Sequence, residues 1–382
     1  MTYATSIQCM HCKKTFSPEL TLFACASCGG PLDIVYNYEQ IKRQIVNSVF
    51  LREPITHWKY SMFYPINQLD KIVTLQEGGT PLVPSVAQED QKAQGSLFFK
   101  YEACNPTGVF KDRGTSVEIT KAVELGIKEV ACATTGNMGA SVAAYAGRAG
   151  IKARIFIPSF ASPIKIQQIK SYGATIIRTG KTYDDAHAHV KALRQQKHIY
   201  LAGDYAHRAE GQKSVGFEIV DQLNWQPPSA IVMPVGNGVL FSAVYKAMCE
   251  LKVVGLIKKL PRLIAVQANG CNPIVQAYRN KKKTITPQPK AKTLATAILC
   301  GNPLEGERVL EAIRATKGTA VSVSDQEMLL AQKQLGKQGL FAELSSAASY
   351  AGAHKLGLHH QNKGPVVCVL TGHGLKDISL KK

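Results

Sequence analysis

Hydrophobic positions along the chain alternate between the spacing of buried strands and the spacing of amphipathic helices. Short apolar runs that predict strands lie at 97–101, 130–134, 153–157, 175–178 and 200–201. Segments with helical spacing lie between them, at 115–125, 140–148, 163–172 and 184–197. This strand-helix repetition predicts a parallel sheet with helices on both faces.

A second block of the same kind follows. Apolar runs at 231–235, 263–267 and 366–371 predict further buried strands, and a helix is expected to end near Leu251. At 382 residues the chain should bury roughly three quarters of its unfolded surface, enough for two domains with cores of their own. The pattern therefore predicts an α/β protein of at least two domains.

One lysine lies where the first of these strands turns into a helix. The turn-forming sequence Asn105-Pro106-Thr107-Gly108 precedes Val109-Phe110-Lys111-Asp112-Arg113-Gly114, so Lys111 falls in the first helical turn. A lysine that is fixed there and partly desolvated can keep the neutral amine that a Schiff base with an aldehyde requires. A surface lysine at a helix start is the alternative interpretation of this residue taken alone.

The stretch from Asn105 to Gly114 closely resembles the lysine motif of the threonine synthase family of pyridoxal-phosphate enzymes, which usually has serine where this chain has Val109. Other segments resemble the same family, in the same order along essentially the whole chain. They are Leu75 to Leu82, Thr134 to Asn137, Glu210 to Ser214, Gly236 to Gly238, Thr293 to Ile298 and Thr371 to Asp377. An ordered series of this kind indicates common descent.

The resemblance implies a two-domain fold type II pyridoxal-phosphate enzyme, with parallel sheets and flanking helices. A large cofactor-binding domain is expected at 39–115 and 201–382, and a small mobile domain at 116–200. Residues 1–38 are expected to form a small zinc ribbon before them. The cofactor is expected in the cleft between the two larger domains.

The resemblance also implies roles for particular residues. Lys111 would hold the cofactor aldehyde and act as the catalytic base, and a loop at a helix start would bind the cofactor phosphate through backbone amides. That loop is Gly236, Asn237, Gly238, Val239 and Leu240. Asn137 would bond the ring hydroxyl and Thr371 the pyridine nitrogen, while Thr134, Thr135 and Arg208 would bind substrate. Ordinary strand-to-helix turns, and a surface arginine, are the structural alternatives.

The implied reaction converts O-phosphohomoserine and water to L-threonine and phosphate. The chain departs from the family just before Arg208, where Ala202-Gly203-Asp204-Tyr205-Ala206 replaces the usual Asn-Ser-x-Asn-Pro. Two enzyme alternatives therefore stay open: β-replacement on O-phosphoserine, as in a cysteate-synthase-like enzyme, and a serine or threonine dehydratase. A non-enzymatic alternative is a zinc-ribbon binding protein on an inactive pyridoxal fold.

Four of the ten cysteines form two Cys-x2-Cys pairs, Cys9 with Cys12 and Cys25 with Cys28, with twelve residues between the pairs. This spacing favours a structural zinc site, because each pair can bind one side of a tetrahedral ion. Two redox dithiols, or a ribbon without metal, are the competing interpretations.

The net charge of +19 raises the possibility of nucleic-acid binding. Outside Lys281-Lys282-Lys283, Lys290 and Lys292, however, the basic residues are dispersed, and no basic stripe with interleaved aromatics occurs. We therefore expect no nucleic-acid partner, and a small phosphorylated amino acid as substrate. No apolar run approaches the roughly 20 residues needed to span a bilayer, and the first residues lack a secretory signal pattern. We expect a cytoplasmic enzyme with no membrane partner; a homodimer is compatible with this interpretation.

Overall fold

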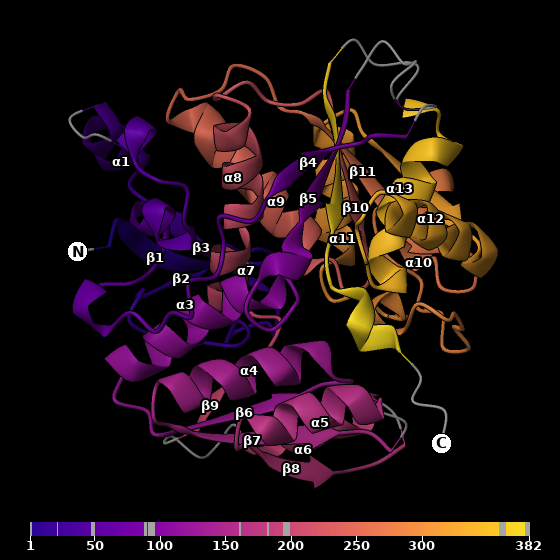
Figure 1. The fold of residues 1–382 in the computed structure, drawn as a ribbon. Helices are drawn as coiled ribbons and strands as arrows, with labels where there is room; N and C mark the ends of the chain where they lie inside the picture. The colour runs from indigo at the N-terminus through magenta and orange to yellow at the C-terminus, as the bar shows by residue number, and fades with distance from the viewer. Residues whose placement is uncertain are drawn as a thin grey trace. The chain divides into compact units, whose positions relative to one another are not determined.

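The computed structural model contains three separate sheets (Figure 1). It describes residues 2–20, 22–46, 50–87, 90, 96–159, 162–181, 183–193, 199–358 and 364–378. The end of the helix expected at 184–197 lies outside these residues. Contacts divide the chain into two units, one holding residues up to Gly78 together with 111–214, the other holding 79–110 and residues from Val215 onward.

The first unit contains a four-stranded parallel sheet of order β8-β7-β6-β9. Its strands are β6 (Glu129–Ala133), β7 (Lys152–Ile157), β8 (Thr175–Arg178) and β9 (Ile199–Leu201), and its helices are α4 (Asn137–Arg148), α5 (Pro163–Ser171) and α6 (Tyr183–Ala192). Alternate β6 residues enter different cores: Val130 and Cys132 pack with α4 and α5, and Ala131 and Ala133 pack with α6. This confirms the expected parallel sheet with helices on both faces.

The second unit contains a six-stranded sheet of order β12-β11-β10-β13-β5-β4, parallel except for the edge strand β4. The strands are β4 (Leu82–Pro84), β5 (Leu97–Tyr101), β10 (Ala230–Pro234), β11 (Arg262–Ala268), β12 (Thr319–Val323) and β13 (Val366–Leu370). All but β4 and β12 were expected from their apolar runs. The unit also contains α9 (Val239–Val253), α10 (Pro273–Arg279), α11 (Gly306–Ala315), α12 (Asp325–Lys337) and α13 (Leu344–Lys355).

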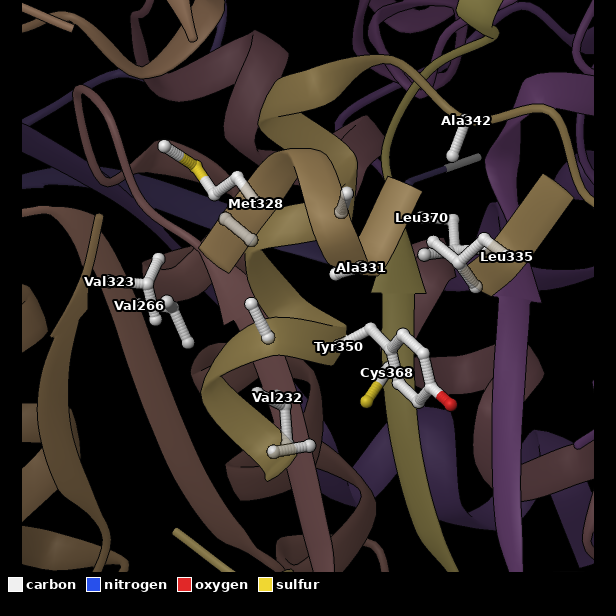
Figure 2. Packing of buried hydrophobic residues seen from close by; sticks show 14 of the residues in the cluster. Val232, Val266, Val323, Met328, Ala331, Leu335, Ala342, Tyr350, Cys368 and Leu370 are labelled. Carbon is white, nitrogen blue, oxygen red and sulfur yellow. The ribbon is translucent and has the colours of Figure 1, made fainter. Parts of the chain in front are cut away.

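Small and branched apolar side chains join this sheet to its helices. Figure 2 shows Val232, Val266 and Cys368 on neighbouring strands, close to Met328 of α12 and Tyr350 of α13. The Tyr350 hydroxyl donates to Asp90 over 3.0 Å, so the one polar atom that this ring brings into the core has a partner. Burial from both sides explains why these strands appear in the sequence as unbroken apolar runs.

The N-terminal ribbon is a three-stranded antiparallel sheet of order β2-β1-β3. It is followed by an arm of one helix and three short 3-10 turns. The elements are β1 (Ala4–Cys9), β2 (Thr15–Phe16), β3 (Leu32–Tyr36), α1 (Tyr38–Val46), η1 (Phe50–Arg52), η2 (His57–Phe63) and η3 (Leu69–Lys71). The arm is anchored through Trp58, whose indole donates to the buried Glu77 carboxylate over 3.0 Å.

Two helices of the first unit approach each other closely, α3 (Lys111–Glu124) and α7 (Ala206–Gln212). A Cβ on Gly211 would lie 2.2 Å from the Arg113 carbonyl oxygen, and a Cβ on Gly114 would lie 2.6 Å from Arg208 Cγ. Glycine at both positions therefore lets the two backbones touch. The contact places the start of α7 against the first turn of α3.

The remaining elements are α8 (Ser214–Gln222) and the short turns η4 (Glu102–Cys104), η6 (Thr296–Ile298) and η7 (Gly374–Asp377). No helix in the described part of the chain is both long enough and apolar enough to cross a membrane.

Candidate active site

Lys111 is the first residue of α3, as the sequence predicts. The turn before it is held by backbone bonds: the Gly108 amide donates to Asn105 over 2.7 Å, and the Phe110 amide donates to the Thr371 carbonyl over 3.0 Å. Gly108 has a φ of +78°, a conformation that favours glycine. The residue next to Lys111 is therefore fixed to the end of β13.

The amine of Lys111 lies beside an acidic side chain of the segment 202–206, the segment that differs from the family pattern. Its Nζ is 3.5 Å from Oδ1 of Asp204, with side-chain exposures of 21% and 10%. A pair this close and this shielded from solvent gives the lysine a fixed anionic neighbour. In the sequence Asp204 is only part of the departure from the family pattern; the structure places it next to the lysine.

Arg208 is completely buried, and its guanidinium bonds within the first unit. It pairs with the Glu118 carboxylate and donates to the Gly203 carbonyl over 2.9 Å and to the Thr115 hydroxyl over 3.1 Å. A longer bond of 3.4 Å reaches the backbone carbonyl of Lys111. These contacts connect α7 directly to the first turn of α3.

Burial and pairing act in opposite directions on this ion pair. Burial raises the pKa of Glu118 to about 7 even though Arg208 and the Gly203 amide lower it. For Arg208, burial lowers the pKa, but the carboxylates of Glu118 and Asp204 more than offset this and raise it. We conclude that the arginine stays charged and that Glu118 is the group of the pair that takes up a proton as the pH falls.

The segment Thr134 to Asn137 joins β6 to α4. The Thr134 hydroxyl accepts from the amides of Gly136, over 2.9 Å, and Gly139, over 3.2 Å. Thr134 is buried, whereas Thr135 and Asn137 are half-buried at the start of the helix. The buried Lys165 of α5 covers Gly136, where a Cβ would lie 2.4 Å from the lysine Cδ.

The glycine-rich loop of the second unit lies between β10 and the 15-residue helix α9. Gly238 caps the helix with a φ of 96° and no side-chain cap bond. The Asn237 carboxamide is turned aside, because its oxygen accepts from the Leu304 amide over 2.7 Å. The helix start therefore offers backbone amides rather than a side chain to a ligand.

Ser242 lies one turn into α9 and is 1% exposed. Within the described part of the chain its hydroxyl has no hydrogen-bond partner. Helical side chains point back toward the N-terminus, so this hydroxyl lies over the first turn of α9. A buried hydroxyl in that place indicates a missing acceptor.

Thr371 follows β13 and is 7% exposed. Its hydroxyl lies 2.9 Å from the Ser346 hydroxyl. The predicted residues thus divide between the two units. Lys111, Thr134, Thr135, Asn137 and Arg208 belong to the first, and Gly236 to Leu240 together with Thr371 belong to the second.

The four predicted metal ligands come together in the ribbon. One ligand atom of each of Cys9, Cys12, Cys25 and Cys28 lies within 4.8 Å of all the others. The Cys9 and Cys28 sulfurs are 3.4 Å apart, and those of Cys12 and Cys25 are 3.6 Å apart. Sulfurs at about 2.3 Å from a tetrahedral zinc would be about 3.8 Å apart, so the cluster fits this ion closely.

The surroundings of Cys25 also suit a thiolate ligand. Burial raises the pKa of Cys25. Hydrogen bonds, including those from the backbone amides of Ser27 and Cys28, outweigh this effect, and the pKa is lowered to about 6. The Ser27 amide lies 3.4 Å from the Cys25 sulfur. The thiolate form that binds a metal is therefore favoured at this position.

Three features of the candidate site were not assigned from the sequence: the Asp204 contact to Lys111, the Glu118 partner of Arg208 and the buried Ser242 hydroxyl. Asp204 was noted only as a departure from the family pattern. The spacing of Lys111, Thr115 and Glu118 along one helix face is a signal that could have found Glu118, since it places them in one row.

Comparison with known proteins places the chain in a class. Residues 73–372 match the family described as "Pyridoxal-phosphate dependent enzyme". Among solved structures, maize serine racemase superposes with a TM-score of 0.68 at 24% identity, covering 79% of this chain and 89% of that one. Threonine deaminase isoform 2 of Solanum lycopersicum gives a TM-score of 0.66 at 20% identity and 92% coverage of both chains. These likenesses, with Lys111 at a helix start, define a fold type II pyridoxal-phosphate dependent enzyme.

Relatives of similar sequence show which family within this class the chain belongs to. The threonine synthase of Methanocaldococcus jannaschii is 42% identical over 376 residues, covering 97% of this chain and 92% of the relative. The threonine synthase of Methanosarcina acetivorans is 41% identical over 377 residues with the same coverage. The chain belongs to the threonine synthase family.

Proposed function

We propose that this enzyme converts O-phosphohomoserine and water to L-threonine and phosphate, with Lys111 as the catalytic lysine. The observation that carries the proposal is the position of Lys111 at the start of α3, in a chain that matches threonine synthases along nearly its whole length. The domain boundaries at 38, 115 and 200 and the cytoplasmic location belong to the same proposal.

The residue types at the proposed positions suit pyridoxal phosphate. Lys111 would hold the cofactor aldehyde, and the amides of Gly236 to Leu240 would bind its phosphate, where the Ser242 hydroxyl supplies a further donor. Asn137 would bond the ring hydroxyl and Thr371 the ring nitrogen. When bound, the cofactor supplies an electron sink for the substrate carbons.

The chain's own groups would then bind substrate and move protons. Lys111 would act as the base that removes protons from the α and β carbons of the substrate. Asp204, 3.5 Å from the lysine Nζ, would stabilise each proton that the amine takes up. Thr134 and Thr135 would bind substrate, and Arg208 would supply positive charge for its phosphate.

A direct assay tests the proposal. Purified enzyme is given O-phosphohomoserine, O-phosphoserine, serine or threonine, and phosphate release and amino-acid products are measured. We expect phosphate and threonine in equal amounts from O-phosphohomoserine. Consumption of O-phosphoserine or free serine alone would favour the alternative reactions, which the altered 202–206 segment keeps open. Failure of borohydride to fix cofactor on the protein would indicate an inactive fold.

Ser242→Ala is expected to weaken cofactor binding about ten- to hundredfold, as the loss of one hydrogen bond to an anion implies. The apoenzyme should be as stable as the parent or more stable, because a buried hydroxyl without a partner is removed. Cofactor titration followed by visible absorbance, and urea unfolding of the apoenzyme, measure the two effects. Ser171→Ala, on the exposed end of α5, is the control. Unchanged affinity would remove Ser242 from the phosphate site.

We also propose that the four ribbon cysteines hold one structural zinc ion. Elemental analysis of enzyme purified without chelator should give one zinc per chain, and Cys25→Ser should lose it. Zinc binding to such a module contributes on the order of 10 kcal/mol to its folding, so the ribbon of the variant should be open to proteolysis. Cys132→Ser, a change at a buried cysteine outside the ribbon, should keep the metal. Metal-free parent protein would contradict this proposal.

A further inference from the structure

The ribbon contains none of the residues proposed to bind cofactor or substrate, but it contacts the segment beside Lys111. Phe23, in the loop between the two cysteine pairs, packs on Tyr205 with ring centroids 4.9 Å apart at 61°. The same ring meets Tyr200 edge-on at 6.0 Å. The rings of Phe23 and Tyr205 adjoin the apolar core formed by β6, β9 and α6, and Tyr200 belongs to the core formed with α4 and α5.

Tyr205 in turn shapes the backbone around Asp204. Its ring covers Gly203, where a Cβ would lie 2.7 Å from Tyr205 Cε2, and its amide donates to the Gly203 carbonyl over 2.8 Å. The Gly203 amide is held by Glu118 over 3.1 Å. Asp204 therefore lies between two residues, Gly203 and Tyr205, that are held by contacts with other segments. The contact of Tyr205 is with the Phe23 ring of the ribbon.

A second contact fixes the ribbon to the other end of α7. The Tyr36 hydroxyl of β3 donates to Glu210 over 2.6 Å, and Lys213 pairs with the same carboxylate over 2.6 Å. The lysine Nζ also lies 4.5 Å from the centre of the Tyr36 ring. The Glu210 and Lys213 side chains are inaccessible to solvent. The ribbon thus holds α7 at both ends.

Helix α7 can pass a displacement on to the lysine, because it touches α3 through backbone at Gly211 and through Arg208 to the Lys111 carbonyl. Close-packed elements shift together rather than deform. Phe23 lies two residues before the proposed metal ligand Cys25, so metal binding would fix the ring in place.

We propose that the ribbon is a positioning element of the active site: Phe23 holds Tyr205, and through it holds Asp204 at Lys111. Phe23 is a positioning residue and touches neither substrate nor cofactor. This inference rests on the proposed role of Lys111, and it makes zinc content a determinant of turnover.

The test is Phe23→Ala in the full-length holoenzyme. We expect kcat to fall about ten- to hundredfold, since displacing a reacting group by about 1 Å has effects of this size, while KM stays within about twofold. The visible circular dichroism of the bound cofactor, measured without substrate, should decrease. Zinc content should stay that of the parent. Phe23→Tyr, which keeps the ring, should restore both signals.

Phe16→Ala on the edge strand β2 is the matched control, and it should leave kcat and the dichroism unchanged. Stripping zinc from the parent should lower kcat as Phe23→Ala does. Stripping it from Phe23→Ala should lower kcat by a smaller factor than stripping it from the parent, because both changes remove the contact of Phe23 with Tyr205. If Phe23→Ala does not fold, Phe23→Leu, which keeps apolar volume but lacks the ring, takes its place.

A variant at position 23 with parent kcat and parent dichroism would overturn the inference. An equal loss in Phe16→Ala would overturn it too, because the effect would then follow from damage to the ribbon in general. If the parent does not use O-phosphohomoserine, the proposed function fails, but the dichroism without substrate still decides whether Phe23 positions the lysine segment.

Discussion

Lys111→Ala should lower turnover of O-phosphohomoserine by about 10⁴-fold or more, because a positioned base alone contributes about 10²- to 10⁴-fold and the variant also loses the cofactor-binding amine. The fold should survive. The variant loses the ion pair with Asp204, whose two side chains keep some contact with solvent, so the free energy of unfolding should fall by about 1 kcal/mol. Steady-state phosphate release measures turnover, and urea unfolding measures stability.

Lys170→Ala, at an exposed position of α5, is the control for removing a lysine. Borohydride should fix cofactor covalently to the control and the parent but not to the Lys111 variant. A Lys111 variant that retains turnover would overturn the assignment of the catalytic lysine. If Lys111→Ala loses both turnover and its folded state, Lys111→Arg is measured in its place, because arginine keeps the positive charge beside Asp204.

Arg208→Ala should lower the free energy of unfolding by about 3–5 kcal/mol, because it leaves the fully buried Glu118 carboxylate without its cation. If Arg208 also binds the substrate phosphate, kcat/KM should fall about ten- to hundredfold, which corresponds to about 1.5–3 kcal/mol for a charge-assisted contact. Urea unfolding and steady-state kinetics measure the two effects separately.

The stability that Arg208→Ala loses should increase as the pH rises. Burial raises the pKa of Glu118 in the folded protein to about 7, above its usual value, so this group favours the folded state at low pH. That contribution is lost as the pH rises toward 7. Without Arg208 the carboxyl should hold its proton to still higher pH, so Arg208→Ala should be more destabilised at pH 8 than at pH 6.

The double variant Arg208→Ala with Glu118→Gln separates binding from packing. The glutamine removes the unpaired charge, so part of the stability should return and the pH dependence should flatten. A kcat/KM that stays low in the double variant supports phosphate binding by Arg208. A kcat/KM that recovers with stability would remove Arg208 from the phosphate site.

The sequence predicted the elements that are apolar on both sides. The runs at 130–134 and 231–235 are strands in the structure within one residue at each end, because strands covered on both faces lack polar interruptions. The strand β12 was missed. Its run Thr-Ala-Val-Ser-Val is interrupted by polar residues, although Ser322 is buried beside β11. Periodicity could not show that a polar residue faces the interior.

For the candidate site, residue identities could be predicted from the sequence but the neighbours of each residue could not. Lys111 was placed at a helix start because turn residues precede it, and the cysteine cluster followed from spacing alone. The pairing of Arg208 with Glu118 required the close approach of α3 and α7, which depends on Gly114 and Gly211 fitting together. Such contacts between distant segments leave no local pattern.

The order of strands in the two larger sheets sets when each can form during synthesis. The sheet of the first unit uses only residues 129–201, so it can assemble once that stretch has left the ribosome. In the second unit β5, near residue 100, pairs with β13, near residue 370, and β13 also joins β5 to β10. Strands β4 and β5 are made early, and β5 therefore lacks its partner strand β13 until almost the whole chain has been translated. Aggregation during expression should therefore begin at this pair of strands, and truncations that remove β13 should form inclusion bodies.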